Sequence, residues 1–421
     1  MTHLVKIDDT AIPDGVVRIA DQLPGPDVLQ PGDIVTLKFM HGFVYLPGLV
    51  LLAAWRKSLP GTAQVVIDDT ATSPETRRFL TNTGFREVIE TGTHHPSVPS
   101  RIGKVPIQAI LKGREKEATV NELVRIFDEY AGHVADTAPF RVLLSELCEN
   151  ALAHSELTTP GYICARVFED TNRCESAIAD TGIGIDQSFR QGTNKAAIDR
   201  IVRGESAVAI ALEGLSSSKP QPGPGTFKTY FGFGLFIVRR LVEVNRGRLT
   251  LLSGSEAVTV EKLSQHSRRL VRPWRGTFAG VVLDLNNPLP LEQVYADADQ
   301  LMIGPHPPAE TKPAIAAVHP TVAPPEEFAL RLSNYGTQLL TRELGTAIRA
   351  DVAGQLAAGR VVKVRLDGIE DITPSCVDEA FGKLSEVIGA ELFGSKVSFE
   401  GGQPVVKTLI QFVLRTRQRS A

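Results

Sequence analysis

Apolar and polar positions between residues 140 and 154 follow the period of an α-helix. The apolar positions recur at spacings of four, three and four, which is typical of a buried stripe: Phe140, Leu144, Leu147 and Ala151. A line of polar residues, Glu146, Asn150 and His154, recurs every four residues and therefore shares one face. Because consecutive residues are about 100° apart on a helix, this polar line borders the buried stripe. The pattern predicts a helix at the edge of a core.

Residues 1–112 alternate between strand and helix patterns. Short alternating or β-branched runs predict strands, and longer mixed runs predict helices. The expected elements are a strand at 34–39, a helix at 46–59, a strand at 63–67 and a helix at 73–83. This order predicts a small α/β domain.

Residues 113–286 combine the helix described above with two glycine-rich motifs. The other expected elements are strands at 161–168, 174–179, 248–252 and 278–285 and a helix at 235–244. Residues 187–229, between the glycine motifs, form a long stretch that ends rich in glycine and proline, with short helical patterns at 195–202 and 207–212. A stretch of this kind is typical of a lid rather than of packed elements. A disordered insertion is the alternative.

Residues 287–326 are rich in proline, and we expect a linker there. Residues 327–421 repeat the alternation of helix and strand, which predicts a second small α/β domain. The expected elements are helices at 335–356, 375–387 and 404–417 and strands at 361–366 and 396–400. Thr373 or Ser375 is a natural N-cap for the helix that begins near Pro374. The chain is therefore predicted to be α/β, with a central α+β sandwich between two smaller domains.

The composition gives little evidence of a charged partner, because 45 basic and 48 acidic residues leave a net charge of −3. No bulk charge indicates nucleic acid or an anionic membrane. The N-terminus lacks the pattern of a secretory signal, and the apolar run at 48–55 is too short to span a bilayer. We therefore expect a cytoplasmic protein whose cysteines remain free thiols: Cys148, Cys164, Cys174 and Cys376.

Glu146 and Asn150 form a candidate functional pair, since a carboxylate stands one helical turn from an amide. A carboxylate suits a general base that activates water or a hydroxyl. The amide oxygen suits Mg²⁺, a cation that prefers oxygen ligands. Taken alone, the pair is equally compatible with a helix whose polar side chains are solvated.

Two glycine-rich motifs follow this helix along the chain. Asp180 ends a predicted buried strand, where its carboxylate can accept a hydrogen bond from an exocyclic amine. Gly182 and Gly184 allow a backbone with positive φ and close approach of a ligand. Gly232 and Gly234 open the next helix, and exposed amides at such a helix start suit phosphates. Each glycine pair taken singly is also compatible with a tight turn.

Four motifs together resemble the GHKL, or Bergerat-fold, ATPases. In chain order they are Glu-Leu-Cys-Glu-Asn-Ala-Leu-Ala-His at 146–154, Asp-Thr-Gly-Ile-Gly at 180–184, Gly-Phe-Gly-Leu at 232–235 and Gly-Thr-Phe at 276–278. That superfamily includes gyrase, heat-shock-90 chaperones, histidine kinases, mismatch-repair ATPases and anti-sigma-factor serine kinases. The resemblance implies a mostly antiparallel sheet with ATP held between a helical layer and a mobile lid.

The resemblance also implies roles for individual residues. Glu146 would be the general base, Asn150 the Mg²⁺ ligand and Asp180 the carboxylate that reads adenine. Gly182 and Gly184 would shape the pocket for the base. Gly232, Gly234 and His154 would lie beside the phosphates. Thr277 would make a minor contact on the adenine side. Two departures, Phe233 in place of a small residue and the long lid, leave the lid contacts open.

Residues 327–421 resemble a STAS-like domain through the stretch 361–382, and residues 1–112 resemble a more divergent one. In STAS regulators of the anti-sigma-antagonist type, a serine before this helix accepts phosphate, and Ser375 falls at that place. Here Thr-Pro-Ser-Cys replaces the usual Asp-Ser-Ser-Gly, so a helix cap is favoured over a phosphoacceptor.

These patterns indicate an ATP-binding, Mg²⁺-dependent ATPase that regulates a protein partner through STAS-like domains in a bacterial-type signalling system. One alternative is a serine/threonine kinase of the anti-sigma type that phosphorylates a STAS-type partner. Another is a nucleotide-sensing module without hydrolysis. A histidine kinase fits less well, because no long helix pair with a phosphoacceptor histidine precedes the core. The sequence leaves the partner and any oligomer undefined.

Overall fold

A computed structural model describes residues 1–40, 43–92, 104–110, 114–131, 138–154, 161–214, 234–303 and 326–420. The chain divides into two compact units, with the boundary between Leu289 and Pro290 for the residues after 234. Both units contain helices and strands, which confirms the predicted α/β class. None of the helices within these ranges has the length and apolar character needed to cross a lipid bilayer. All four cysteines are free and buried, as expected.

The first unit begins with a three-stranded parallel sheet in the order β1–β2–β3. Its elements are β1 (Thr2–Ile7), α1 (Asp14–Gln22), β2 (Ile34–Phe39), α2 (Leu46–Ser58), β3 (Gln64–Asp68), α3 (Pro74–Asn82) and α4 (Phe85–Thr91). The structure confirms the predicted strands and helices between residues 34 and 83. It adds β1 and α1 before them, because apolar Val5 and Ile7 alternate with exposed residues and enter the core.

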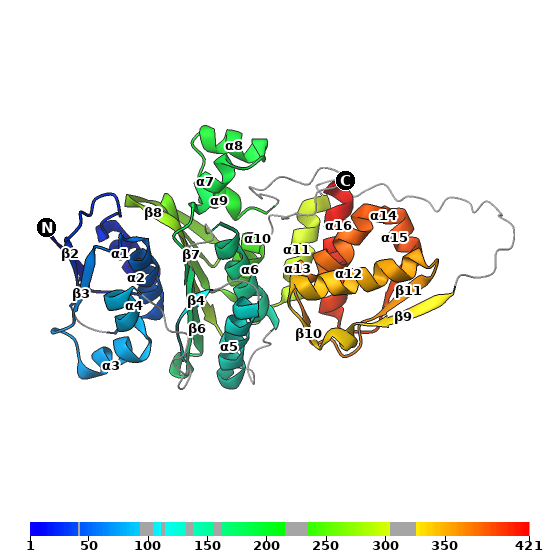
Figure 1. Cartoon of the computed structure of the whole chain (residues 1–421), viewed down its shortest axis with the longest axis horizontal. Helices are drawn as coiled ribbons and strands as arrows, with labels where there is room; N and C mark the ends of the chain where they lie inside the picture. The colour runs from blue at the N-terminus through cyan, green and yellow to red at the C-terminus, as the bar shows by residue number, and fades with distance from the viewer. Residues whose placement is uncertain are drawn as a thin grey trace. The chain divides into compact units, whose positions relative to one another are not determined.

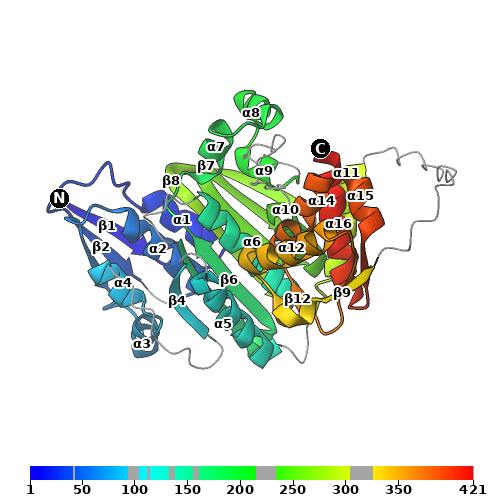
Figure 2. The ribbon, with the colours of Figure 1, turned by 45° about the vertical axis from the view of Figure 1, so that its right-hand side comes forward.

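A five-stranded antiparallel sheet follows, in the order β4–β5–β6–β8–β7. Its strands are β4 (Lys104–Ile110), β5 (Gly161–Phe168), β6 (Arg173–Ala179), β7 (Arg248–Glu261) and β8 (Ser264–Asp284). Helices α5 (Arg114–Ala131), α6 (Ala138–His154) and α10 (Gly234–Asn245) cover one face (Figures 1 and 2). This is the predicted antiparallel sandwich. Strand β4 lies within the segment 1–112 but belongs to this sheet.

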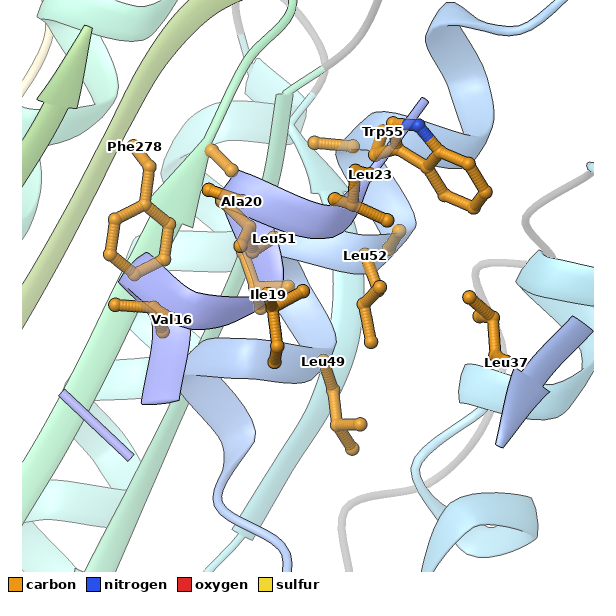
Figure 3. Close-up of a cluster of buried hydrophobic side chains, with 14 of the residues drawn as sticks. Val16, Ile19, Ala20, Leu23, Leu37, Leu49, Leu51, Leu52, Trp55 and Phe278 are labelled. Atoms are coloured by element: carbon orange, nitrogen blue, oxygen red, sulfur yellow. The ribbon is translucent and has the colours of Figure 1, made fainter. Parts of the chain in front are cut away.

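The opposite face of the five-stranded sheet is covered by α1 and α2, which therefore lie between two sheets (Figure 1). Figure 3 shows Val16 and Ile19 of α1 and Leu51 of α2 among the side chains that lie between Leu37 of β2 and Phe278 of β8. These side chains belong to one buried cluster that spans both sheets. Segments 1–92 and 104–284 thus contribute side chains to one common buried cluster on this face of the sheet.

Strands β7 and β8 extend beyond the predicted 248–252 and 278–285 and bend sharply. The register shifts at Ser253 and Gly254 of β7. Beyond the bend, Thr259 Oγ1 returns to 3.4 Å from Thr250 Oγ1, and Glu261 lies 2.8 Å from Arg248. The bend depends on glycine, since Gly254 has φ of 57° and this left-handed region favours residues without Cβ.

The second unit contains a parallel sheet in the order β13–β11–β9, a short β10–β12 pair and covering helices. The elements are α11 (Leu291–Ile303), β9 (Glu327–Arg331), β10 (Gln338–Leu339), α12 (Arg342–Ala357), β11 (Val361–Arg365), β12 (Asp371–Ile372), α13 (Pro374–Val377), α14 (Lys383–Ile388), α15 (Ala390–Lys396), β13 (Val397–Glu400) and α16 (Pro404–Ser420). A single π-helical turn, Asp378–Gly382, joins α13 to α14.

Two expectations for this unit need correction. The segment expected to be a linker contains α11, because its buried Tyr295 packs against Phe412 of α16 with ring centroids 5.7 Å apart. The helix expected from residue 335 begins at Arg342, where the Thr341 side chain accepts a hydrogen bond from the amide of Leu344. Such a capping bond marks a helix start.

Candidate functional site

Helix α6 presents the predicted polar line at the edge of the core. The apolar stripe is buried, as expected: Phe140, Leu144, Leu147 and Ala151. Glu146 and Asn150 are partly exposed, and α6 contacts α10, the short helix α7 (Gly184–Arg190) and the strands β6 and β8. The helix ends at His154, whose side chain lies outside the described part of the structure.

The start of α10 lies directly against the Glu146–Asn150 pair. A Cβ at Gly234 would be 2.5 Å from Glu146 Oε2 and 3.4 Å from Asn150 Nδ2. The second glycine motif is therefore adjacent to the first motif, although the two are far apart in sequence. Gly232 and Phe233 lie outside the described residues.

The amide of Asn150 fits a ligand at this place. Its Nδ2 atom is buried and has no hydrogen-bond partner among the described residues. A buried polar group without a partner is rare in native proteins and calls for an explanation such as a bound ligand. Because the helix start of α10 also offers backbone amides to an anion, the place suits a phosphate.

Asp180 follows β6 and is 1% exposed. Its backbone amide donates to the carbonyl of Thr277 at 2.8 Å, and its Oδ1 accepts from the amide of Gly182 at 2.7 Å. Burial raises the pKa of this carboxyl to about 7, against the smaller lowering effects of the backbone groups of Gly182 and Thr277. Burial alone holds the pKa near neutrality, as is common at functional sites.

The two glycines after Asp180 differ in their roles. Gly184 has φ of 73°, as expected for a position that needs glycine. Gly182, where glycine also allows a positive φ, does not adopt one. Its contribution is the amide that donates to Asp180.

The Gly276–Thr277 motif lies beside Asp180. Gly276 has φ of 89°, and a Cβ there would be 2.2 Å from the carbonyl oxygen of Asp180. Thr277 is partly exposed and pairs with Ser253 of β7 across the ladder. The structure thus brings Asp180, Gly184, Gly276 and Thr277 together.

Sequence reasoning missed Ser253, which is 3% exposed within this group. Its Oγ accepts from the amide of Ile185 at 2.8 Å and donates to the carbonyl of Gly276 at 2.8 Å. The available signal was a serine directly after the predicted strand 248–252, which is mostly apolar. That signal does not identify the partners of the hydroxyl.

The first half of the expected lid is packed against the domain. Helices α7, α8 (Lys195–Val202) and α9 (Ala207–Ala211) follow one another, and α7 and α9 contact β7. Glu256 Oε2 accepts from Ser206 Oγ at 2.7 Å and from the amide of Val208 at 3.3 Å, which fixes the start of α9. The expectation of a lid without packed elements is therefore wrong for residues 187–214. Residues 215–229 lie outside the described ranges.

In the second unit, Thr373 rather than Ser375 caps α13. The Thr373 hydroxyl accepts from the amide of Cys376 at 3.2 Å. Ser375 stands in the first turn, partly exposed, with its Oγ 3.1 Å from Thr373 Oγ1. The preferred assignment of Ser375 as a helix cap is corrected, because Thr373 holds the extended backbone that a cap requires.

Within the described ranges, no group of three or more His, Cys, Asp or Glu side chains could hold a metal ion. Mg²⁺ is commonly held by one or two protein oxygens together with phosphates and water. Asn150 beside the start of α10 fits that mode, in which the phosphates supply the remaining ligands.

Residues 135–268 match the family model of histidine kinase-, DNA gyrase B- and HSP90-like ATPases. The matched stretch includes α6, the Asp180 loop and the start of α10, and this part of the chain is a GHKL-type ATPase domain. The family implies ATP binding and an activity of the ATPase or kinase type. A comparison with curated proteins found no match. Both flanking segments, where a STAS-like resemblance is expected, lie outside the matched residues.

Proposed function

We propose that this protein is a Mg²⁺-dependent ATPase that controls the engagement of a protein partner through its flanking segments. The observation that carries the proposal is the contact of Gly234 with Glu146 and Asn150. It joins a candidate base, a candidate cation ligand and a helix start suited to phosphate. The Asp180 loop, anchored to Thr277, supplies a second recognition point beyond this contact.

Each residue has a defined task in the proposed reaction. The Asp180 carboxylate accepts a hydrogen bond from the exocyclic amine of adenine, and the amides at the start of α10 hold the phosphates. The Asn150 side chain would hold the cation through its amide oxygen. Bound Mg²⁺ would neutralise charge on the phosphates. The Glu146 carboxylate orients a water molecule and removes its proton as the water attacks the γ-phosphorus, while the bond from that phosphorus to the β–γ bridging oxygen breaks and ADP leaves.

The proposed regulation uses the shared core of the first unit. Helices α1 and α2 pack on the face of the sheet opposite to α6, and α1 contacts β8, the strand that carries Thr277. A shift of Asp180 and Thr277 on nucleotide binding would therefore be transmitted to the N-terminal segment by β6 and β8. The second unit, which resembles STAS-like regulators in sequence, is the proposed docking segment for the partner.

The test follows the γ-phosphate of labelled ATP in the presence of Mg²⁺. The proposal expects label as free phosphate, with Glu146→Gln lowering turnover by about 10²- to 10⁴-fold while ATP binding is retained, as for the loss of a general base. The matched control is Glu129→Gln, an exposed carboxylate on α5 that pairs with Arg125. Label attached to protein would instead show that the activity is that of a protein kinase rather than of an ATP hydrolase. Equal turnover in Glu146→Gln would remove Glu146 from its role.

A further inference from the structure

Three chain segments meet beneath Asp180: the loop into α7, the bend of β7 and the bend of β8 at Gly276. The hydroxyl of Ser253, on β7, joins the other two segments to each other. It accepts from the Ile185 amide and donates to the Gly276 carbonyl, each at 2.8 Å. Both bonds lie within the normal range for strong hydrogen bonds, and both are buried.

The surrounding backbone is so close that it leaves no room for other side chains. A Cβ at Gly184 would be 2.8 Å from Ser253 Oγ and 2.9 Å from the Gly276 carbonyl oxygen. Gly184 and Gly276 both have positive φ, so each is held in a conformation that an ordinary residue adopts only with strain. The hydroxyl of Ser253 therefore bridges two backbone groups, the amide of Ile185 and the carbonyl of Gly276.

This bridge completes a closed set of contacts around Asp180. The Asp180 amide donates to Thr277, the residue after Gly276, and Gly276 in turn accepts from Ser253. Ser253 then binds Ile185, at the start of α7, which closes the path back along the chain to Asp180. Loss of the hydroxyl would release the loop on one side while the Asp180–Thr277 bond remained.

We propose that Ser253 is a positioning residue for the adenine end of the nucleotide, acting through the Asp180 loop without touching the reacting atoms. The inference rests on the proposed function of the site. If the loop without its bridge adopts the binding conformation for only about a tenth of the time, every adenine ligand binds about tenfold more weakly, because the apparent Kd scales inversely with that fraction.

The sheet offers a matched control for a merely structural role. Ser176 of β6 is 2% exposed, and its Oγ has no hydrogen-bond partner among the described residues. A buried serine in this sheet therefore does not need a bonded hydroxyl. Ser176→Ala removes the same atom from a comparable environment without breaking a bridge.

The experiment is calorimetric titration of the full chain with adenosine, ADP and Mg²⁺-ATP, combined with steady-state turnover. Ser253→Ala should raise Kd by about tenfold for all three ligands, while kcat at saturating ATP stays within about twofold. Ser253→Cys, which keeps the shape but bonds weakly, should behave in the same way and replaces the alanine variant if that variant does not fold. Ser176→Ala should match the wild type.

Two results would overturn the inference. One is wild-type affinity for adenosine in a folded Ser253 variant, and the other is a loss confined to ATP, which would place the effect at the phosphates. Failure of the proposed function is distinguishable in the wild-type protein, which would then bind none of the three ligands or would bind ATP without releasing free phosphate.

Discussion

The backbone of Gly234 lies against the carboxylate of Glu146, so closely that a Cβ at position 234 would come within 2.5 Å of Oε2. Residues 88 positions apart in sequence therefore form one surface of the ATPase domain. The absence of a side chain at 234 is what allows the start of α10 to approach the candidate base.

Gly234→Ala should lower turnover by at least about tenfold, because the new methyl group displaces the Glu146 carboxylate and a small misplacement of a catalytic group is costly. The measurement is phosphate release under saturating ATP. The control is Gly354→Ala on α12, an exposed helical glycine with open space around it, which should gain about 0.5–1 kcal/mol of stability. Unchanged turnover in Gly234→Ala would place Glu146 away from the reaction.

Asp180→Asn should weaken adenine binding and stabilise the free protein above neutral pH. Burial raises the pKa of Asp180 to about 7, so the folded state keeps a proton that the unfolded state releases near pH 3.8. The wild type therefore loses stability as pH rises between these values, by up to about 1.4 kcal/mol per pH unit. The neutral amide avoids this loss.

The check on Asp180 is a pair of thermal unfolding curves at pH 5 and pH 8, with nucleotide titrations alongside. The stabilisation by Asp180→Asn should be larger at pH 8, where the wild-type carboxyl is ionised. A difference that is equal at the two pH values would contradict the raised pKa. Unchanged affinity for adenosine would show that Asp180 does not bind adenine.

Glu256→Ala should loosen helix α9. The carboxylate of Glu256 accepts from Ser206 Oγ and from the Val208 amide, next to the positive end of the helix. Its loss should cost about 1 kcal/mol locally and lower the hydrogen-exchange protection of α9 amides by about fivefold. Glu261→Ala on the same strand, which removes a half-exposed ion pair with Arg248, is the control. Equal exchange in the two variants would refute the anchoring role.

Arg417→Met should destabilise the second unit by about 3–5 kcal/mol, because it leaves the buried carboxylate of Asp378 without its partner. Arg417 Nε and Nη2 donate to the two carboxylate oxygens of Asp378 at 2.8 and 2.9 Å, and both residues are buried. Chemical denaturation of the full chain measures the loss. The exposed pair Arg365–Glu400, tested by Arg365→Met, should lose less than about 1 kcal/mol.

Adding Asp378→Asn to Arg417→Met should recover part of the lost stability, since the uncompensated charge is removed. A double variant as unstable as the single one would show that packing of the long arginine side chain, rather than charge, carries the effect.

Much of the first unit could be predicted because its signals are local. The spacing of Glu146 and Asn150 beside a buried stripe depends only on the helical period, and the helix formed as expected. The strands β5 and β6 likewise follow from short apolar runs. The bond between the Gly182 amide and the Asp180 carboxylate could not be predicted, because it depends on how the sheet places the end of β6.

The sequence by itself determined which residue types stand at helical or strand spacing, and hence the α/β class and the helix that carries Glu146 and Asn150. Only the tertiary structure decided that Gly234 lies against Glu146, that Ser253 bridges Ile185 and Gly276, and that α1 and α2 share a core with the antiparallel sheet. The physical reason is range: helical and strand periods are set by neighbouring residues, whereas these contacts join segments whose separation in sequence carries no record of their distance in space.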